Sequence, residues 1–150
     1  MGGRTVSQDV ADIVRLTHDY ALYNDSFRID ELVELFVADA SFDMEPAGLA
    51  RYDGRDAIRA FFEKERRALT HLFHLTSNHR VDVDGDRATG TAYFLAIGVT
   101  RRESIENQAR GYYADAYVRT ADGWRFASRQ SNPLIPWVPI RRPADAGEPS

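Results

Sequence analysis

Val81-Asp-Val-Asp-Gly-Asp-Arg-Ala-Thr-Gly-Thr-Ala-Tyr93 is the stretch of sequence that decides the fold. Residues alternate in character up to Asp84-Gly85-Asp86 and alternate again after it, which is typical of two antiparallel strands joined by a tight turn. The first strand is predicted from about Leu72 to Val83 and the second from Ala88 to Thr100. The chain is therefore predicted to contain a β-hairpin with long arms.

Two further strands continue this pattern towards the C-terminus. One is predicted over residues 108–119, with a turn at Ala121-Asp-Gly123, and the last over residues 124–131. Together the strands predict an antiparallel meander. The segment after Asn132 is rich in proline, with Pro133, Pro136, Pro139 and Pro143. Because proline cannot donate a ladder hydrogen bond, we expect an extended flap or a free tail here, not a central strand.

Helical periodicity precedes the meander. The apolar residues that predict a first helix over residues 8–23, with Ser7 as its N-cap, are Val10, Ile13, Val14, Thr17 and Ala21. A short helix is predicted over residues 30–36 and a third from Gly54 to about Ala68, with a strand over residues 40–45 between them. Three helices followed by a long antiparallel sheet predict an α+β domain in which the helices cover one face.

Composition narrows the classes of function. The chain has 150 residues, no cysteine and a net charge of −4. A nucleic-acid-binding protein needs a clustered basic face, which this balance argues against. Without cysteine there are no disulfides, thiolate metal sites or cysteine nucleophiles. No apolar run approaches membrane-spanning length, and the N-terminus lacks the apolar region of a signal peptide, so we expect a cytoplasmic protein.

A carboxylate and an imidazole occupy suggestive places in this layout. Asp25 closes the predicted first helix and His74 opens the first long strand. A carboxylate that accepts a hydrogen bond from one imidazole nitrogen fixes the tautomer and leaves the other nitrogen free to take a proton. We therefore predict that Asp25 and His74 lie within hydrogen-bonding distance.

Strand parity sets a condition on this prediction. Val81 and Val83 alternate with polar residues, whereas His74 belongs to the even-numbered set. If the valines face the core, His74 reaches the same side only if a β-bulge between about Leu75 and His79 shifts the phase. Strongly bent sheets often carry such bulges near active sites. The other candidates for a functional histidine are, in order, His79 and His71.

The order of elements resembles that of the nuclear transport factor 2 (NTF2-like) superfamily. The resemblance rests on the segments 30–42, 54–62 and 123–126. It implies a cystatin-like α+β cone, in which a curved antiparallel sheet and three N-terminal helices enclose a pocket. It covers residues 8–135, which we take as one domain between a flexible N-terminus (1–7) and a Pro-rich tail (136–150).

Within that superfamily the chain is most similar to the SnoaL-like branch, which includes scytalone dehydratase and the bile-acid 7α-dehydratases. By this resemblance His74 falls at the catalytic histidine and Asp25 at the aspartate that orients it. Tyr20 falls at a catalytic tyrosine of the bile-acid enzymes. Each residue also has a structural alternative: Tyr20 as packing, Asp25 as a cap for the second helix, and His74 as a core histidine.

Other positions of the family are only partly matched. Tyr113 falls at a pocket amide of scytalone dehydratase, and Asn78 is also expected to contact the ligand. Met44 stands where both enzymes carry a tyrosine. No histidine lies near Gly98, where scytalone dehydratase has its second, and no carboxylate lies near Ala96, where the bile-acid enzymes have theirs. Neither known substrate is therefore implied.

The resemblance favours an enzyme: a cofactor-independent lyase or isomerase, above all a dehydratase, that acts on a small hydrophobic oxygenated compound. His74 would remove a proton beside a carbonyl, Asp25 would orient and stabilise the imidazolium, and Tyr20 would donate a hydrogen bond to the developing charge. The alternatives are a non-catalytic ligand-binding protein and a polyketide cyclase with the same dyad. No metal is expected, because His71 and His74 would point to opposite faces of a strand.

Further charged and apolar residues permit other interpretations. Asp43 and Glu45 lie near the position of the carboxylate base of ketosteroid isomerases, although Asp43 is expected to be solvated. Asp115 and Arg129 are expected to form an ordinary cross-strand ion pair. Both faces of the strand 88–100 are apolar, and only one can cover the pocket. We therefore expect the other face to pack against a second subunit in a homodimer or homotrimer.

Overall fold

Six strands form a single curved sheet in the order β2-β1-β6-β5-β4-β3 in the computed structural model, which describes residues 2–140 and their side chains as far as residue 136. Neighbours in β3–β6 are antiparallel, which confirms the predicted meander, and β1 joins β6 in parallel. The elements in chain order are α1 (Val6–Asp25), α2 (Ile29–Glu34), β1 (Phe36–Asp43), a 3₁₀ turn η1 (Glu45–Ala47), β2 (Arg51–Asp53), α3 (Arg55–Ala68), β3 (Leu69–Asp84), β4 (Arg87–Thr100), β5 (Glu106–Thr120) and β6 (Gly123–Ile140).

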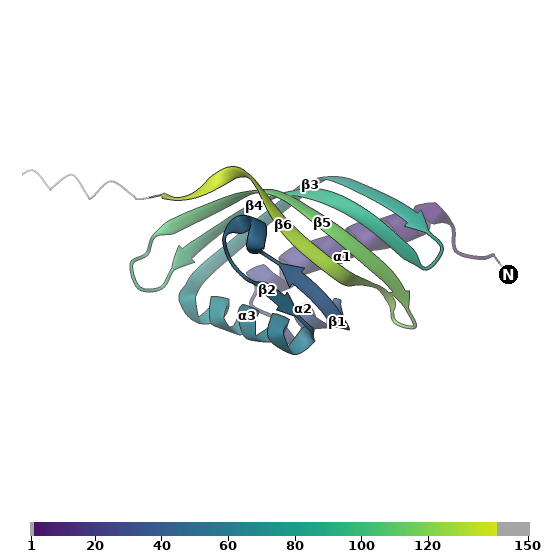
Figure 1. The fold of residues 1–150 in the computed structure, drawn as a ribbon, viewed down its shortest axis with the longest axis horizontal. Helices are drawn as coiled ribbons and strands as arrows, with labels where there is room; N and C mark the ends of the chain where they lie inside the picture. The colour runs from purple at the N-terminus through teal and green to yellow at the C-terminus, as the bar shows by residue number, and fades with distance from the viewer. Residues whose placement is uncertain (1, 141–150) are drawn as a thin grey trace, which may run out of the picture.

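The four long strands arch over the helices, so the sheet has an outer face and a helix-covered inner face (Figure 1). Helix α1 runs along the inner face against β3, while α2 and α3 lie below the sheet beside β1 and β2. The predicted α+β class with three helices on one face is confirmed. Among the described residues, no helix is long and apolar enough to cross a membrane.

Helix α1 starts earlier and ends later than its periodicity indicates. Thr5, not Ser7, is the N-cap, because its hydroxyl accepts a hydrogen bond from the backbone N–H of Gln8 while the Gln8 side chain accepts one from the N–H of Thr5. The last helical residue is Asp25, and the backbone N–H of Ser26 closes the final turn. The capped helix therefore includes two residues of the terminus that we predicted to be flexible.

Strand β6 corrects the prediction for the proline-rich segment. Its residues beyond Asn132 continue the ladder with β5, where Pro133 pairs with Gly111 and Pro139 with Asn107. Strand β1 pairs with β6 only as far as Gln130, so this part of β6 is a sheet edge. An edge tolerates proline because one side of the strand needs no ladder hydrogen bond. The domain thus runs past residue 135 to Ile140, and residues 141–150, including Pro143, lie outside the described part.

Aromatic rings fill the space between sheet and helices. Tyr20 from α1, Phe62 from α3 and Phe126 from β6 are all almost fully buried. The ring centroids of Phe62 and Phe126 lie 6.1 and 6.0 Å from that of Tyr20, in edge-on geometry that suits the aromatic quadrupoles. Tyr20 therefore lies at the centre of the aromatic cluster on the inner face and contacts residues from both the helices and the sheet.

Candidate active site

Asp25 and His74 meet where the end of α1 reaches the start of β3. The Nδ1–H of His74 donates to Asp25 Oδ1 over 2.6 Å, and the backbone N–H of His74 donates to Asp25 Oδ2 over 2.8 Å. The predicted contact is confirmed, and both carboxylate oxygens take part. These two hydrogen bonds orient the ring and leave Nε2 as the basic nitrogen. The side chains are 7% and 25% exposed for His74 and Asp25, so the pair is recessed but not sealed.

A bulge in β3 turns His74 inward, as strand parity requires. The pairing of β3 with β4 shifts register between Ser77 and Arg80, and Asn78 has a positive φ of 54°. Before the bulge His74 faces the core, and after it Val81 does. The predicted change of phase is confirmed. Asn78 itself is exposed at the bulge, so it stands apart from the buried group that it was expected to join.

The ring of Tyr20 lies beside the imidazole of His74. The two ring centroids are 6.1 Å apart, and Tyr20 is only 2% exposed. Burial raises the pKa of Tyr20 well above its ordinary value, and the nearby Arg129 cation partly offsets the rise. The hydroxyl therefore stays protonated and is available as a hydrogen-bond donor. Asp25 is the last residue of α1, and its carboxylate reaches the imidazole of His74 from there.

Arg129 is a site residue whose importance the sequence did not reveal. It forms a bidentate pair with Asp115, with both N···O distances at 2.8 Å, and both side chains are completely buried. Its guanidinium lies over the rings of Tyr113 at 3.8 Å and Tyr20 at 4.3 Å. The expected cross-strand pair exists, but it is a core element and not an ordinary surface pair. Its Nη1 has no hydrogen-bond partner among the described residues.

Tyr113 is buried in this group, whereas Met44 lies at its margin. Tyr113 stacks on Phe94 with a centroid distance of 4.3 Å and meets the Tyr20 ring edge-on at 5.9 Å. Burial also raises the pKa of Tyr113. Met44 is partly buried and packs against the core cluster at the N-cap of η1. Tyr113 thus shares the environment of the dyad.

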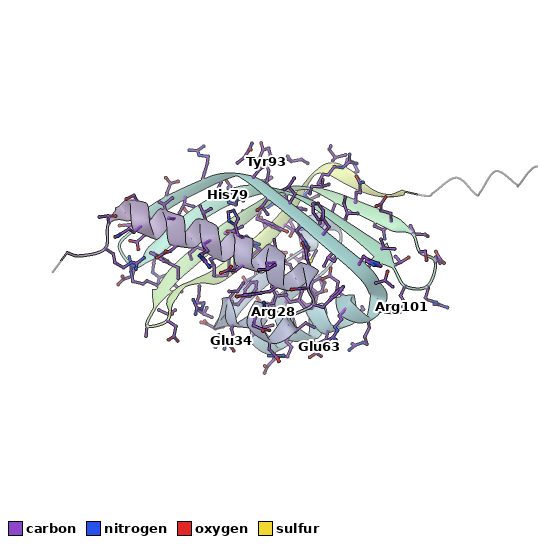
Figure 2. All side chains as sticks on the ribbon, turned by 180° about the vertical axis from the view of Figure 1, so that it is seen from behind. Arg28, Glu34, Glu63, His79, Tyr93 and Arg101 are labelled. Atoms are coloured by element: carbon purple, nitrogen blue, oxygen red, sulfur yellow. The ribbon has the colours of Figure 1, made fainter. Side chains whose placement is uncertain are left out.

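The other histidines occupy different environments. His71 is exposed, and its ring forms a hydrogen bond with the hydroxyl of the adjacent Thr70. His79, labelled in Figure 2, meets the ring of His18 edge-on at 5.1 Å beside α1. Burial lowers the pKa of His79, and its Nε2 has no hydrogen-bond partner among residues 2–136. Among the described residues, His74 is the histidine whose ring is hydrogen-bonded to a carboxylate.

Glu65 is a second acid that sequence reasoning missed. It lies on α3, is partly buried, and burial raises its pKa to about 7. The negative charge of Asp25 adds to the rise, while a charged His74 opposes it. The available signal was its place one turn after the apolar Phe61 and Phe62, on the face of the helix that turns inward.

A comparison with known protein families shows the family to which the chain belongs. The SnoaL-like domain family matches residues 5–130. The chain belongs to the SnoaL-like domain family. An uncharacterized protein of Mycobacterium tuberculosis is 31% identical over 123 residues, which are 81% of this chain and 82% of the relative. Its Mycobacterium bovis counterpart matches equally well.

Solved structures with the same fold cover nearly the whole SnoaL-like chain. A provisionally assigned aromatic ring hydroxylase from Novosphingobium aromaticivorans superposes with a TM-score of 0.86 and 28% identity over 91% of this chain and 96% of that one. A provisionally assigned scytalone dehydratase from the same organism gives 0.78 and 26%, over 92% and 93%. A hexachlorocyclohexane dehydrochlorinase gives 0.79 at 19% identity, over 91% and 92%, a likeness of fold alone.

Asp43 offers no second base in this SnoaL-like domain. It is buried, not solvated as expected, and accepts hydrogen bonds from the Gln130 side chain at 2.8 Å and the Glu45 backbone N–H at 2.9 Å. These bonds hold the pKa of Asp43 below its usual range. A carboxylate stabilised in this way is a weak proton acceptor. Glu45 is exposed.

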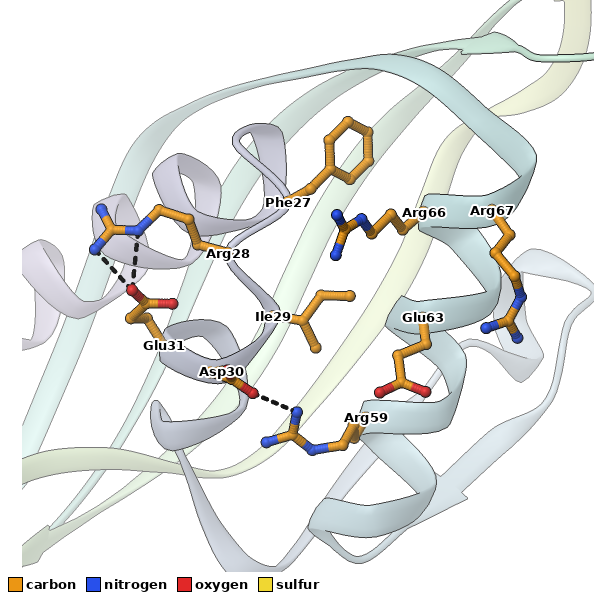
Figure 3. Close-up of a pocket in the computed structure, with 9 residues that line it drawn as sticks. All are labelled: Phe27, Arg28, Ile29, Asp30, Glu31, Arg59, Glu63, Arg66 and Arg67. Carbon is orange, nitrogen blue, oxygen red and sulfur yellow. Dashed lines mark hydrogen bonds and ion pairs between the residues drawn. The ribbon is translucent and has the colours of Figure 1, made fainter.

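The two described surface grooves of the SnoaL-like chain lie away from the dyad. One, of about 460 Å³, separates α2 from α3 and is crossed by the ion pair Arg59–Asp30, while Arg28 and Glu31 pair with each other on the α2 side (Figure 3). The other, of about 600 Å³, lies over β3–β6 and is lined by residues such as Arg80 and Thr91. Neither is lined by Asp25 or His74. The candidate site is therefore the recessed group of Asp25, His74 and Tyr20, and not either groove.

Proposed function

We propose that this protein is a cofactor-independent lyase or isomerase, specifically a dehydratase of a small, hydrophobic, oxygenated compound. The observation that carries the proposal is the 2.6 Å hydrogen bond between Asp25 and His74 beside the buried Tyr20. An oriented imidazole with one free nitrogen is suited to general base catalysis. The aromatic surroundings favour a hydrophobic substrate over a highly charged one.

The proposed reaction begins at a C–H bond beside a carbonyl. Nε2 of His74 takes the proton, and the bond electrons pass into the carbonyl to form an enolate. Asp25 stabilises the imidazolium, and the Tyr20 hydroxyl donates a hydrogen bond to the enolate oxygen. The enolate then forms a carbon–carbon double bond and expels the β-hydroxyl, which needs one proton to leave as water.

Family membership supports this class of reaction. The solved structure provisionally assigned as a scytalone dehydratase is 26% identical to this chain and covers 92% of it. The same fold also serves other chemistries, so the residues of the site must carry the argument. Here they are a base, its orienting carboxylate and a protonated phenol, all within one aromatic cluster.

The test is a panel of β-hydroxy ketones, with loss of water followed by mass spectrometry. His74→Ala should lower turnover by about 10²- to 10⁴-fold, because it removes the general base. Asp25→Asn should leave the fold intact and lower turnover by disturbing the tautomer. Tyr20→Phe should lower kcat more than it raises KM, because its hydrogen bond strengthens as charge develops.

His71→Ala is the matched control, since His71 is an exposed histidine on the same strand. It should leave turnover unchanged. Wild-type turnover in His74→Ala would reject the mechanism. Saturable binding of panel compounds without any conversion would identify a ligand-binding protein instead, and a ring-closed product without loss of water would identify a cyclase.

A further inference from the structure

Glu65 lies on the core-facing side of α3, near the dyad. Ile58 and Phe62 on this side of the helix are buried at 0% and 2% exposure, and Glu65 follows them at spacings of seven and three residues. The Phe62 ring contacts Tyr20, which contacts His74. Glu65 therefore stands one helical turn beyond a residue that already touches the site.

The carboxyl of Glu65 is not held in an ion pair within the described part of the chain. No ion pair or hydrogen bond to its side chain occurs among residues 2–136. His74 on β3 and Asp25 on α1 are close enough for their charges to affect the pKa of Glu65, and the charge of Glu65 in turn affects the pKa of Tyr20 and Tyr113. With a pKa raised to about 7, the carboxyl carries its proton in a large part of the molecules at neutral pH.

We propose that Glu65 is the proton donor to the departing hydroxyl, acting as the acid that complements His74. The proposal rests on the dehydratase function inferred above. It divides the work between two groups that approach a substrate from different elements: the base from β3 and the acid from α3. A base and an acid held on different elements can then serve opposite ends of one elimination.

The step balances without another reactant. His74 gains the proton from carbon, the C–H electrons become the new carbon–carbon π bond by way of the enolate, and the C–O bond breaks with its electrons on oxygen. That oxygen takes the proton of Glu65 and leaves as water. The protein is left with a His74 cation and a Glu65 carboxylate, and transfer of one proton from His74 to Glu65, directly or through solvent, restores both.

The experiment separates the two proton transfers. Wild type, Glu65→Gln and His74→Ala are incubated in D₂O with a β-hydroxy ketone, and deuterium at the α-carbon is measured alongside loss of water. Glu65→Gln should keep deuterium exchange and lose about 10²- to 10⁴-fold in elimination. His74→Ala should lose both. Glu63→Gln is the matched control, because Glu63 faces the α2–α3 groove, and it should behave as wild type (Figure 3).

A measurement without substrate tests the acid itself. Infrared difference spectra should show a protonated carboxyl band that titrates near pH 7 and is missing in Glu65→Gln. A band that titrates near 4.5, or normal elimination by Glu65→Gln, would overturn the role of Glu65 while leaving the dehydratase standing. Wild-type protein that neither exchanges nor eliminates across the panel would overturn the dehydratase and this role together.

Discussion

At the scale of single residues, the Arg129–Asp115 pair is both a buried charge and a structural support. Its guanidinium holds Tyr20 and Tyr113 through their ring faces, so the pair sets the position of the proposed hydrogen-bond donor. Arg129→Met should lower the free energy of unfolding by about 3 to 5 kcal/mol, because it leaves Asp115 buried without a partner. Urea unfolding of the variant against wild type measures the change.

The double variant Arg129→Met/Asp115→Leu supplies the control for that prediction. It removes both charges, so most of the lost stability should return. If the double variant were as unstable as the sum of the two single variants, the loss would come from packing and not from an unpaired charge.

Glu65 gives the stability of the protein a dependence on pH. Its pKa is about 7 in the folded protein against 4.5 for a free glutamate side chain, so the folded state binds the proton more tightly. The contribution is fully present below pH 4.5 and is lost as pH rises through 7. Glu65→Gln should therefore become more stable relative to wild type between pH 5 and pH 8, by roughly 3 kcal/mol at most. Urea midpoints at both pH values test this, and an equal gap at both would contradict it.

Individual residues of the site were predictable to different degrees. Asp25 and His74 could be placed because one ends a periodic helix and the other opens an alternating strand, and because parity demanded a bulge. The pairing of Asp115 with Arg129 could also be predicted, but its complete burial and the inward position of Glu65 could not, because charged residues within apolar patterns are usually solvated. Asp115 lies between Tyr113 and Tyr117 on the inward face of β5, a signal visible only once that face is known.

At the scale of elements, the close contact between β5 and β6 depends on Gly111. A Cβ atom at this position would collide with the backbone carbonyl of Asn132, where β6 bends into its proline-rich part. Backbone cannot give way as a side chain can, so Gly111→Ala should lower the free energy of unfolding by about 1 to 3 kcal/mol. Thermal unfolding followed by circular dichroism measures the effect.

Gly98→Ala on β4 is the matched control for the close approach. Its Cβ would come within 3.2 Å of Leu69 Cδ1, the end of a flexible side chain that can move aside. This variant should unfold near the wild-type temperature. Equal loss in both variants would mean that general strand rigidity, and not the β5–β6 contact, is responsible.

Most elements were predictable from period alone, and the exceptions have physical reasons. The long strands and α3 follow their alternation and helical spacing closely. The three-residue β2 is too short to show a period, and it forms because β1 offers it a partner. The edge segment of β6 could not be predicted, because its prolines exclude a central strand and only the sheet order reveals an edge.

At the scale of the whole molecule, the outer face of the sheet carries an exposed apolar patch on β3 and β4. Phe73, Leu75 and Tyr93 are 50%, 56% and 48% exposed, and Tyr93 points away from the helices (Figure 2). Their even-numbered neighbours Ala92 and Phe94 face inward, so this is the face expected to meet a second subunit. We predict a homodimer or homotrimer through it. Leu75→Glu should convert the assembly to monomers in multi-angle light scattering.

Leu22→Glu is the control for assembly, because Leu22 is equally exposed at 57% but lies on α1, away from the sheet. Its mass in solution should match that of the wild type. A wild-type monomer at high micromolar concentration would contradict the prediction, as would an oligomer that Leu75→Glu leaves intact.

Because of the bulge at Asn78, the number of residues in β3 determines which of its side chains face inward. Residues before it present histidine inward and phenylalanine outward, and residues after it present valine inward. Deletion of one residue there would exchange the inward and outward positions in one half of the strand. Either His74 would then lie on the outer surface or the valines would be exposed to water. A substitution in β3 changes one side chain, whereas a deletion of one residue would change the facing of a whole half of the strand and so remove either the inward His74 or the inward valines.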